Sequence, residues 1–338
     1  MEHSRDYLFD NIKVLLISSV VMAHFFRVSG YFDTGSLSRT IYTMIFLYLM
    51  QGFFFVSGYF SGNVDKCRQA AFKTFMIPYV LFMVLFYFAR LIVFGNAHFD
   101  ILQPTHGMWY LLAMFAFRFF VKDLEKVRYI VPVSLAAYFA AGLIPMLTET
   151  LALGRIVSFL FFFMLGHSFT PETIDKIRSV PKYITGPMLA GLIGISYWIS
   201  ASGVDIELLH IKTNYIEYGV SPVTCLVSRV AVLTLSLAFL FVIINLVPRK
   251  KLAVSGVGRN TMTVYLFHIF IRYIIKDNSV YGDGSVMYYL IVFALTALTV
   301  YVFSRPFIAD AYNRMIDSIY RYLISLPKAK LFGRRETI

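Results

Sequence analysis

The first apolar segment of the chain carries two polar side chains, Lys13 and His24, separated by ten mostly apolar residues. On an α-helix their separation of eleven positions amounts to about 1100°, so both side chains share one face, about 16 Å apart along the axis. Asp10 and Arg27 fall within about 60° of that stripe. Near neutral pH a histidine can take up and release a proton, and a lysine can hold an anion. The structural alternative is that Lys13 marks the end of a span and His24 hydrogen-bonds a neighbouring helix.

The amino-acid composition indicates that these side chains lie in a membrane protein. Of the 338 residues, 58% are hydrophobic, 17% aromatic and only 15% charged, with a mean hydropathy of +0.69. Apolar runs long enough to cross a bilayer recur from end to end, which indicates an all-α, polytopic helical membrane protein. The net charge of +12 is spread between the apolar runs rather than gathered in one patch, so we expect the lipid bilayer, and no nucleic acid, as a partner.

We expect one integral membrane domain over residues 1–338, with a short basic cytoplasmic tail over about 305–338. The fourth, sixth and ninth of ten predicted transmembrane segments fall short of the roughly 20 residues that a full crossing needs. The predicted segments are Val14–Ser29, Ile41–Phe60, Phe72–Phe94, Met108–Phe120, Tyr129–Leu147, Ile156–Phe169, Ile184–Ser200, Val223–Leu246, Met262–Ile275 and Met287–Val302.

The loops between these segments alternate in charge. Most of the 31 Lys and Arg residues fall in one set of loops and in the two terminal regions, whereas the opposite loops hold Arg39, Lys212 and Lys276. By the positive-inside rule, both termini are expected to be cytoplasmic and the number of spans to be even. We therefore expect a multi-pass protein of the inner (cytoplasmic) membrane.

Six arginines lie inside or at the edge of a predicted span. A cation at membrane depth costs roughly 2.5 kcal/mol or more and normally faces protein or water, although some arginines snorkel to an interface. Together they favour a polar cavity that accepts anionic groups such as phosphates. They are Arg27, Arg90, Arg118, Arg155, Arg229 and Arg272.

Several segments resemble the acyltransferase 3 family of integral membrane O-acyltransferases. FDNIKVLLISSVVMAHFF is similar to its opening span, in which a basic residue precedes a histidine by eleven positions, here Lys13 and His24. Asp10 and Asn11 resemble the fucose 4-O-acetylase-like branch. QGFFFVSGYF resembles the end of the second span, PTHGMWYLLAMFAFR the fourth, RIVSFLFFFMLGH the sixth and GRNTMTVYLFHIF the late Tyr-x-x-His helix.

The resemblance implies acyl transfer from a cytosolic acyl-CoA, such as acetyl-CoA, to a hydroxyl of a carbohydrate or a lipid-linked glycan. His24 then serves as general base towards the acceptor hydroxyl, or takes the acyl group itself; the sequence leaves both open. The residues assigned to acyl-CoA binding are Lys13, Asp10, Asn11, Arg118 and Arg155.

Further residues are assigned to acceptor binding or to support of the reacting groups. Ser57 and Gly58 end the second span, where exposed backbone N–H groups can meet an anion. The structural alternative for Ser57 and Gly58 is an ordinary helix terminus. For the aromatic residues of the fourth span it is a belt of aromatic side chains at the membrane interface. The other assigned residues are His106, Trp109, Tyr110, Tyr265, His268 and Arg272.

Other features receive no site. His3, His98 and His210 are expected in terminal or loop positions without a role, and no His and Glu pair has the spacing of metal ligands, so no metal cofactor is expected. A transporter or flippase for a polar or glycan substrate is the alternative function, because buried charges and short helices suit it equally well. A third and weaker alternative is a membrane subunit that only binds a glycan-synthesis partner.

Overall fold

The computed structural model describes residues 6–29, 31–147, 150–212, 219–277, 282 and 284–330. Within these residues every regular element is a helix. The α-helices are α1 Leu8–Val28, α2 Leu37–Tyr59, α3 Val64–Ala71, α4 Ile77–Phe94, α5 Trp109–Leu124, α6 Ile130–Ala140, α7 Leu153–Ser168, α8 Pro171–Ser179, α9 Lys182–Ala201, α10 Pro222–Leu246, α11 Thr261–Asp277, α12 Val286–Phe303 and α13 Pro306–Lys330. The shorter ones are the π-helix η1 Phe72–Met76 and the 3-10 helices η2 His106–Met108, η3 Thr150–Ala152, η4 Ile206–His210 and η6 Ser255–Arg259.

The polytopic helical bundle expected from the sequence is confirmed. Each of the ten predicted spans coincides with a helix, and seven helices among the described residues are long and apolar enough to cross a membrane. The remaining three are shorter: α5 has 16 residues, α11 has 17 and α6 only 11. The fifth predicted span therefore ends earlier than expected, at Ala140 instead of Leu147. The sixth predicted span is not short as expected, because η3 and α7 together form a helix of 19 residues, Thr150–Ser168. The crossing number of ten stays a prediction.

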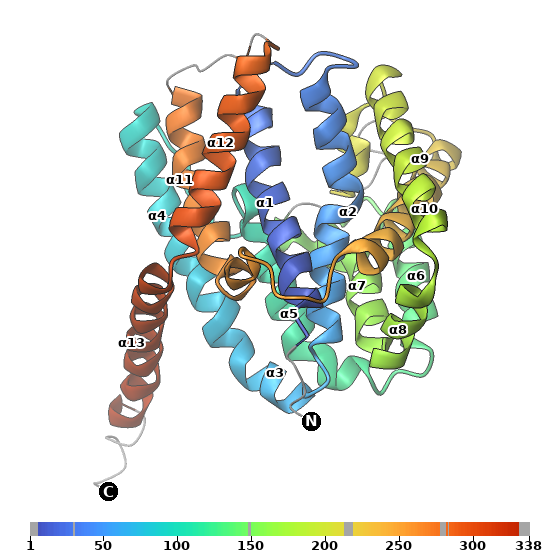
Figure 1. The fold of residues 1–338 in the computed structure, drawn as a ribbon. Helices are drawn as coiled ribbons and strands as arrows, with labels where there is room; N and C mark the ends of the chain where they lie inside the picture. The colour runs from blue at the N-terminus through green and yellow to red at the C-terminus, as the bar shows by residue number, and fades with distance from the viewer. Residues whose placement is uncertain are drawn as a thin grey trace, which may run out of the picture.

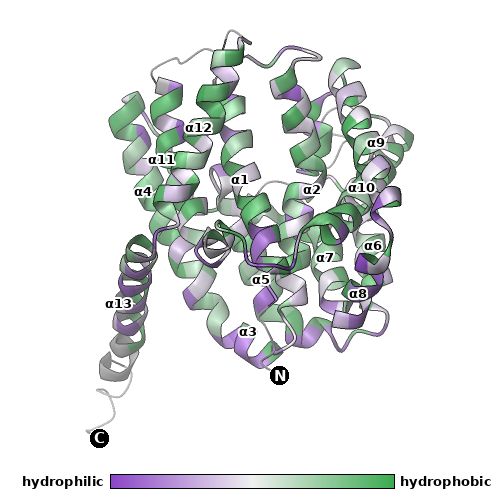
Figure 2. Cartoon of the chain, in the orientation of Figure 1, coloured by the Kyte–Doolittle hydropathy of each residue, from purple (hydrophilic) through white to green (hydrophobic). Residues whose placement is uncertain are grey.

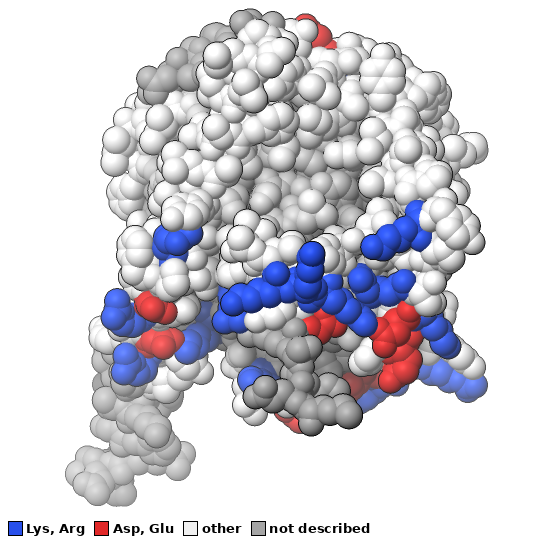
Figure 3. Space-filling model, in the orientation of Figure 1, with Lys and Arg blue, Asp and Glu red and all other residues white. Residues whose placement is uncertain are grey.

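Three polar helices were not expected from the span analysis. They are α3, α8 and α13, and Figure 2 shows hydrophilic residues concentrated on them. In Figure 3 the Lys and Arg side chains gather in a band across the same end of this face, while the surface above the band is nearly free of charge. The start of α1 and the far end of α13 also lie at that end (Figure 1). The positive-inside rule predicts that this end faces the cytoplasm.

Helix α1 stands at the centre of the bundle and contacts α2, α11 and α12 (Figure 1). The packing of α2 against α7 is close because each helix has a glycine at the contact. A Cβ at Gly58 would collide with the carbonyl of Phe163, and one at Gly166 with the carbonyl of Phe55. These two helices, with α1 and α11, frame the interior of the bundle.

Local signals account for several helix ends. Ser36 begins α2 by accepting a hydrogen bond from the Arg39 N–H, and Ser221 begins α10 in the same way, followed by Pro222 at the first helical position. Helix α4 ends at Gly95, whose φ of 71° lies in the left-handed region that favours glycine.

Candidate functional site

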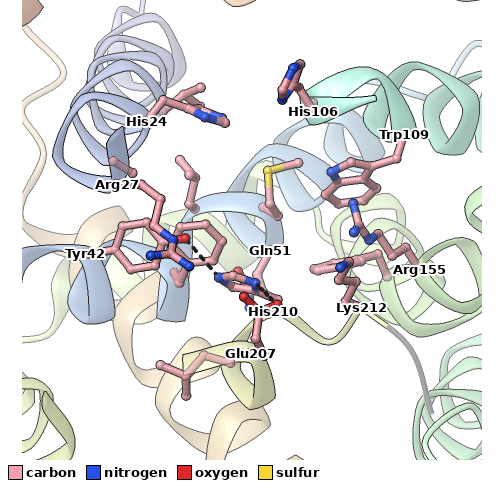
Figure 4. A pocket seen from close by; sticks show the side chains of 18 of the residues that line it. His24, Arg27, Tyr42, Gln51, His106, Trp109, Arg155, Glu207, His210 and Lys212 are labelled. Atoms are coloured by element: carbon pink, nitrogen blue, oxygen red, sulfur yellow. Dashed lines mark hydrogen bonds and ion pairs between the residues drawn. The ribbon is translucent and has the colours of Figure 1, made fainter. Parts of the chain in front are cut away.

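A cavity of about 370 Å³, here called the central cavity, lies inside the bundle. Its walls come from α1, α2, α5, α7, α11, η4 and the segment before α5. Figure 4 shows His24 and His106 at one end of this cavity and His210 with Glu207 towards the other. The residues assigned from the sequence that line it are His24, His106, Trp109, Arg155, Tyr265 and Arg272.

A smaller cleft of about 100 Å³, the lysine cleft, holds the other conspicuous side chain of α1. Lys13 lines it together with Ser57 and Tyr110. The Lys13 Nζ lies 3.2 Å from a carboxylate oxygen of Asp10. Tyr265 lines both the lysine cleft and the central cavity, so the two spaces meet at this residue.

A third space of about 340 Å³, the vestibule, adjoins the central cavity at the end away from Lys13. The two share Arg27, Glu207 and His210 in their walls. The lysine cleft, the central cavity and the vestibule therefore form a series along α1, and His24 lies on the middle one.

The polar stripe on α1 that the sequence predicted is thus present. Lys13 lines the lysine cleft, His24 the central cavity, and Arg27 both the central cavity and the vestibule. Next to His24 lies His268 of α11, with 5.0 Å between the ring centroids. His268 is almost completely buried and its Nδ1 lies 3.0 Å from the Val264 carbonyl, to which it can donate.

A cluster in η4 was missed in the sequence. The Nδ1 of His210 lies 3.1 Å from the Glu207 carboxylate, and its Nε2 lies 3.1 Å from the Tyr42 hydroxyl. The hydrogen bond from His210 lowers the pKa of Glu207 to about 2. His210 was expected to have no role, yet it lines the central cavity. The spacing of Glu207 and His210, one helical turn apart, is the signal that could have revealed the pair.

The six arginines inside or at the edge of the predicted spans divide into two groups; Arg229 is the one of them that is fully buried. Arg27, Arg155 and Arg272 line the central cavity, where the Arg155 guanidinium lies 4.6 Å from the Trp109 ring centroid. The others bind backbone elsewhere. Arg90 donates to the His98 carbonyl, Arg118 to the Phe60 carbonyl, and the fully buried Arg229 to the Tyr138 carbonyl.

Three of the five residues assigned to acyl-CoA binding line none of the three spaces; they are Asp10, which pairs with Lys13, Asn11 and Arg118. Asn11 donates to the carbonyls of Pro248 and Lys250 and accepts from Ser255, so it anchors the segment before η6. Arg118 lies 2.8 Å from the Cys67 sulfur, in a separate pocket at the α3 end of the bundle. Their acyl-CoA roles stay predictions.

Gly58 also has a packing explanation. The space where its side chain would stand is filled by the backbone of α7, and its carbonyl accepts a hydrogen bond from Ser61. The structure thus accounts for the glycine by helix packing.

Comparison with known proteins identifies the family. Residues 6–305 match the family model described as an acyltransferase domain, that of acyltransferase 3. The chain belongs to the acyltransferase 3 family. The comparisons with curated proteins and with solved structures gave no match.

Membership of the acyltransferase 3 family confirms the resemblance inferred from the motifs and makes this protein a multi-pass membrane acyltransferase. The match does not favour the transporter alternative. It also does not distinguish the fucose 4-O-acetylase-like branch, which stays a prediction. Three of the motif residues, His24, His106 and Tyr265, converge on the central cavity from different helices.

Proposed function

We propose that this membrane acyltransferase transfers an acetyl group from acetyl-CoA to a hydroxyl of a cell-envelope carbohydrate or its lipid-linked precursor. In this proposal the protein lies in the inner (cytoplasmic) membrane and takes acetyl-CoA from the cytosol. The observation that carries the proposal is the series of three spaces along α1, with Lys13 at one end, His24 in the middle and a vestibule at the other end.

The donor would enter from the lysine cleft. Lys13 would hold a phosphate of CoA, because an ammonium group makes charge-assisted hydrogen bonds to phosphate oxygens. The distance from Lys13 to His24 along α1, about 16 Å, is comparable to the reach of the pantetheine arm. The arm would pass Tyr265, which lines both spaces.

The acceptor would enter from the vestibule. Arg27 and the Glu207–His210 pair line both the vestibule and the central cavity, so an acceptor passing between them meets hydrogen-bonding groups suited to sugar hydroxyls. In the central cavity the acceptor hydroxyl would meet His24.

His24 would act as general base. Its imidazole takes the hydroxyl proton while the acceptor oxygen attacks the thioester carbonyl; the C–S bond then breaks, and the CoA thiolate receives the proton. The alternative is a transient acyl-histidine, in which His24 attacks the thioester before the acceptor does.

The test uses purified protein in liposomes with acetyl-CoA and an extract of envelope glycans. Release of free CoA should depend on the glycan, and His24→Ala should reduce it by about 100-fold or more. His98→Ala is the matched control, because His98 is exposed and does not line the central cavity. Undiminished turnover in His24→Ala would remove His24 from the mechanism.

The same preparation separates the two roles of His24. With radiolabelled acetyl-CoA and no acceptor, a general base gives no labelled protein, whereas an acyl carrier gives up to one acetyl group per chain. Mass spectrometry of the glycans then identifies the acceptor that carries the label.

A further inference from the structure

His106 has an unusual backbone conformation for a residue with a side chain. Its φ is +50°, in the left-handed region, where a non-glycine residue is strained by roughly 1–2 kcal/mol. The segment around it is pinned to α11, since the Tyr265 hydroxyl donates to the Gly107 carbonyl. A Cβ at Gly107 would lie 2.6 Å from that hydroxyl, so a larger residue there would displace Tyr265. The tertiary contacts therefore hold His106 in place despite the strain.

The ring of His106 is fixed by two neighbours on α11. It packs edge-on against Tyr273, with 5.2 Å between the ring centroids. Its Nδ1 lies 3.2 Å from a terminal nitrogen of Arg272. A guanidinium can only donate hydrogen bonds, so the Nδ1 of His106 must be the acceptor. The imidazole is then neutral, with its proton on Nε2.

This proton has no acceptor among the residues that the structure describes. The Nε2 of His106 is buried without a hydrogen-bond partner there, and the same holds for the Nε of Arg272. A buried donor left unpaired costs about 1–3 kcal/mol, and a catalytic role is one of the reasons for which a protein keeps such a group. Both residues line the central cavity together with His24, and Figure 4 shows His24 and His106 on different elements at the same end of it.

We propose that His106 is a catalytic residue of the acyl transfer, and that its Nε2–H donates to the carbonyl oxygen of the acyl group as this becomes the oxyanion. This inference rests on the proposed function and goes beyond it, because the proposed function gives only His24 a role in the chemical step. Arg272 is a positioning residue that keeps the proton of His106 on Nε2.

The electron balance of the step is complete. The acceptor oxygen forms a bond to the carbonyl carbon as His24 takes its proton, and the C=O electron pair moves to the oxygen that His106 holds. When the C=O bond reforms, the C–S bond breaks, and the CoA thiolate takes the proton from His24. His106 neither gains nor loses a proton.

The tautomer of His106 argues against a role as a second general base. A second general base would need a lone pair on the nitrogen that faces the substrate, but the contact with Arg272 leaves the lone pair on Nδ1. A neutral N–H donor in a water-poor site is suited to an oxyanion, because the donor is already oriented when the charge develops.

The experiment compares two substitutions. Asparagine tolerates the left-handed conformation and places its amide near Nδ1, so His106→Asn keeps the backbone and the contact with Arg272 but removes the Nε2 donor. Glutamine places an amide N–H near the position of Nε2. We expect kcat to fall by about 100-fold in His106→Asn, with KM for acetyl-CoA within about threefold, and to recover in part in His106→Gln.

A second measurement does not depend on turnover. A ketone analogue of acetyl-CoA, in which a CH₂ group replaces the thioester sulfur, carries a ¹³C-labelled carbonyl and is added to each variant in liposomes. The bound carbonyl resonance should move downfield in the wild type and in His106→Gln, and much less in His106→Asn.

The outcomes separate this inference from the proposed function. If the analogue binds to His106→Asn with the wild-type carbonyl shift, and kcat stays within about threefold, the oxyanion role is overturned while acetyl transfer stands. If the wild type neither binds the analogue nor releases CoA, the proposed function fails and the oxyanion role fails with it.

Discussion

The imidazole of His268 lies 5.0 Å from that of His24, centroid to centroid, and His268 is not among the residues that line the central cavity. Because the His268 Nδ1 can donate to the Val264 carbonyl, its Nε2 is left with a lone pair, which has no partner among the described residues. A small rotation of the His24 ring would let its N–H donate to this lone pair. His24 would then present its other nitrogen to the acceptor hydroxyl.

We therefore predict that His268→Phe, which keeps a ring but removes the lone pair, lowers CoA release by about tenfold. ¹⁵N NMR of histidine-labelled protein, with His24 assigned by the His24→Gln difference, should show one tautomer of His24 in the wild type and a mixture in the variant. Unchanged ¹⁵N shifts would mean that His268 does not orient His24.

Lys13→Gln should raise KM for acetyl-CoA by about tenfold or more, because a charge-assisted hydrogen bond to a phosphate is worth about 1.5–3 kcal/mol. Its effect on kcat should be small. Lys73→Gln is the control, since Lys73 pairs with Asp317 of α13 outside the cavity series. Steady-state kinetics with acetyl-CoA and with acetyl-pantetheine, which lacks the phosphates of the nucleotide, would check the reason. An equal KM increase for both donors would contradict phosphate binding by Lys13.

Gly58→Ala should destabilise the fold by about 1–3 kcal/mol, because the added methyl group would push α2 away from the backbone of α7. Gly191→Ala in α9 is a matched control. No atom lies within 4 Å of the Cβ position there, and alanine favours a helix. Thermal unfolding in detergent should show a lower midpoint for the first variant only. Equal midpoints would refute the close packing of α2 and α7.

Glu207→Gln should change how stability depends on pH. The pKa of this carboxyl falls from 4.5 to about 2 in the folded protein, because His210 hydrogen-bonds it. The ionised form thus contributes stability that is fully present above about pH 4.5 and is lost as the pH falls towards 2. The unfolding midpoint of the wild type should drop over this range more steeply than that of Glu207→Gln. Asp33→Asn, which changes an exposed carboxylate, should behave like the wild type.

The apolar helices and their order could be predicted from the sequence because these signals are local. A run of apolar residues long enough for a bilayer forms a helix whatever its neighbours are, since every backbone polar group must be satisfied within the segment. The stripe of Lys13, His24 and Arg27 follows from the helical repeat alone, and it lies on the cavity series as expected. The early end of α6 at Ala140 was not visible in the same way. The chain just after it packs against α10, where a Cβ at Gly142 would lie 2.3 Å from the Nε of Arg229.

The tertiary structure alone decided which polar side chains share a cavity. Arg272 and Arg118 look alike in the sequence, yet one faces His106 and the other Cys67, because the rotation of each helix is set by its packing. His210 lies on a short 3-10 helix without an apolar period, so nothing local placed it beside Tyr42. The strained backbone and the single tautomer of His106 likewise arise from contacts with α11, more than 150 residues away in the chain.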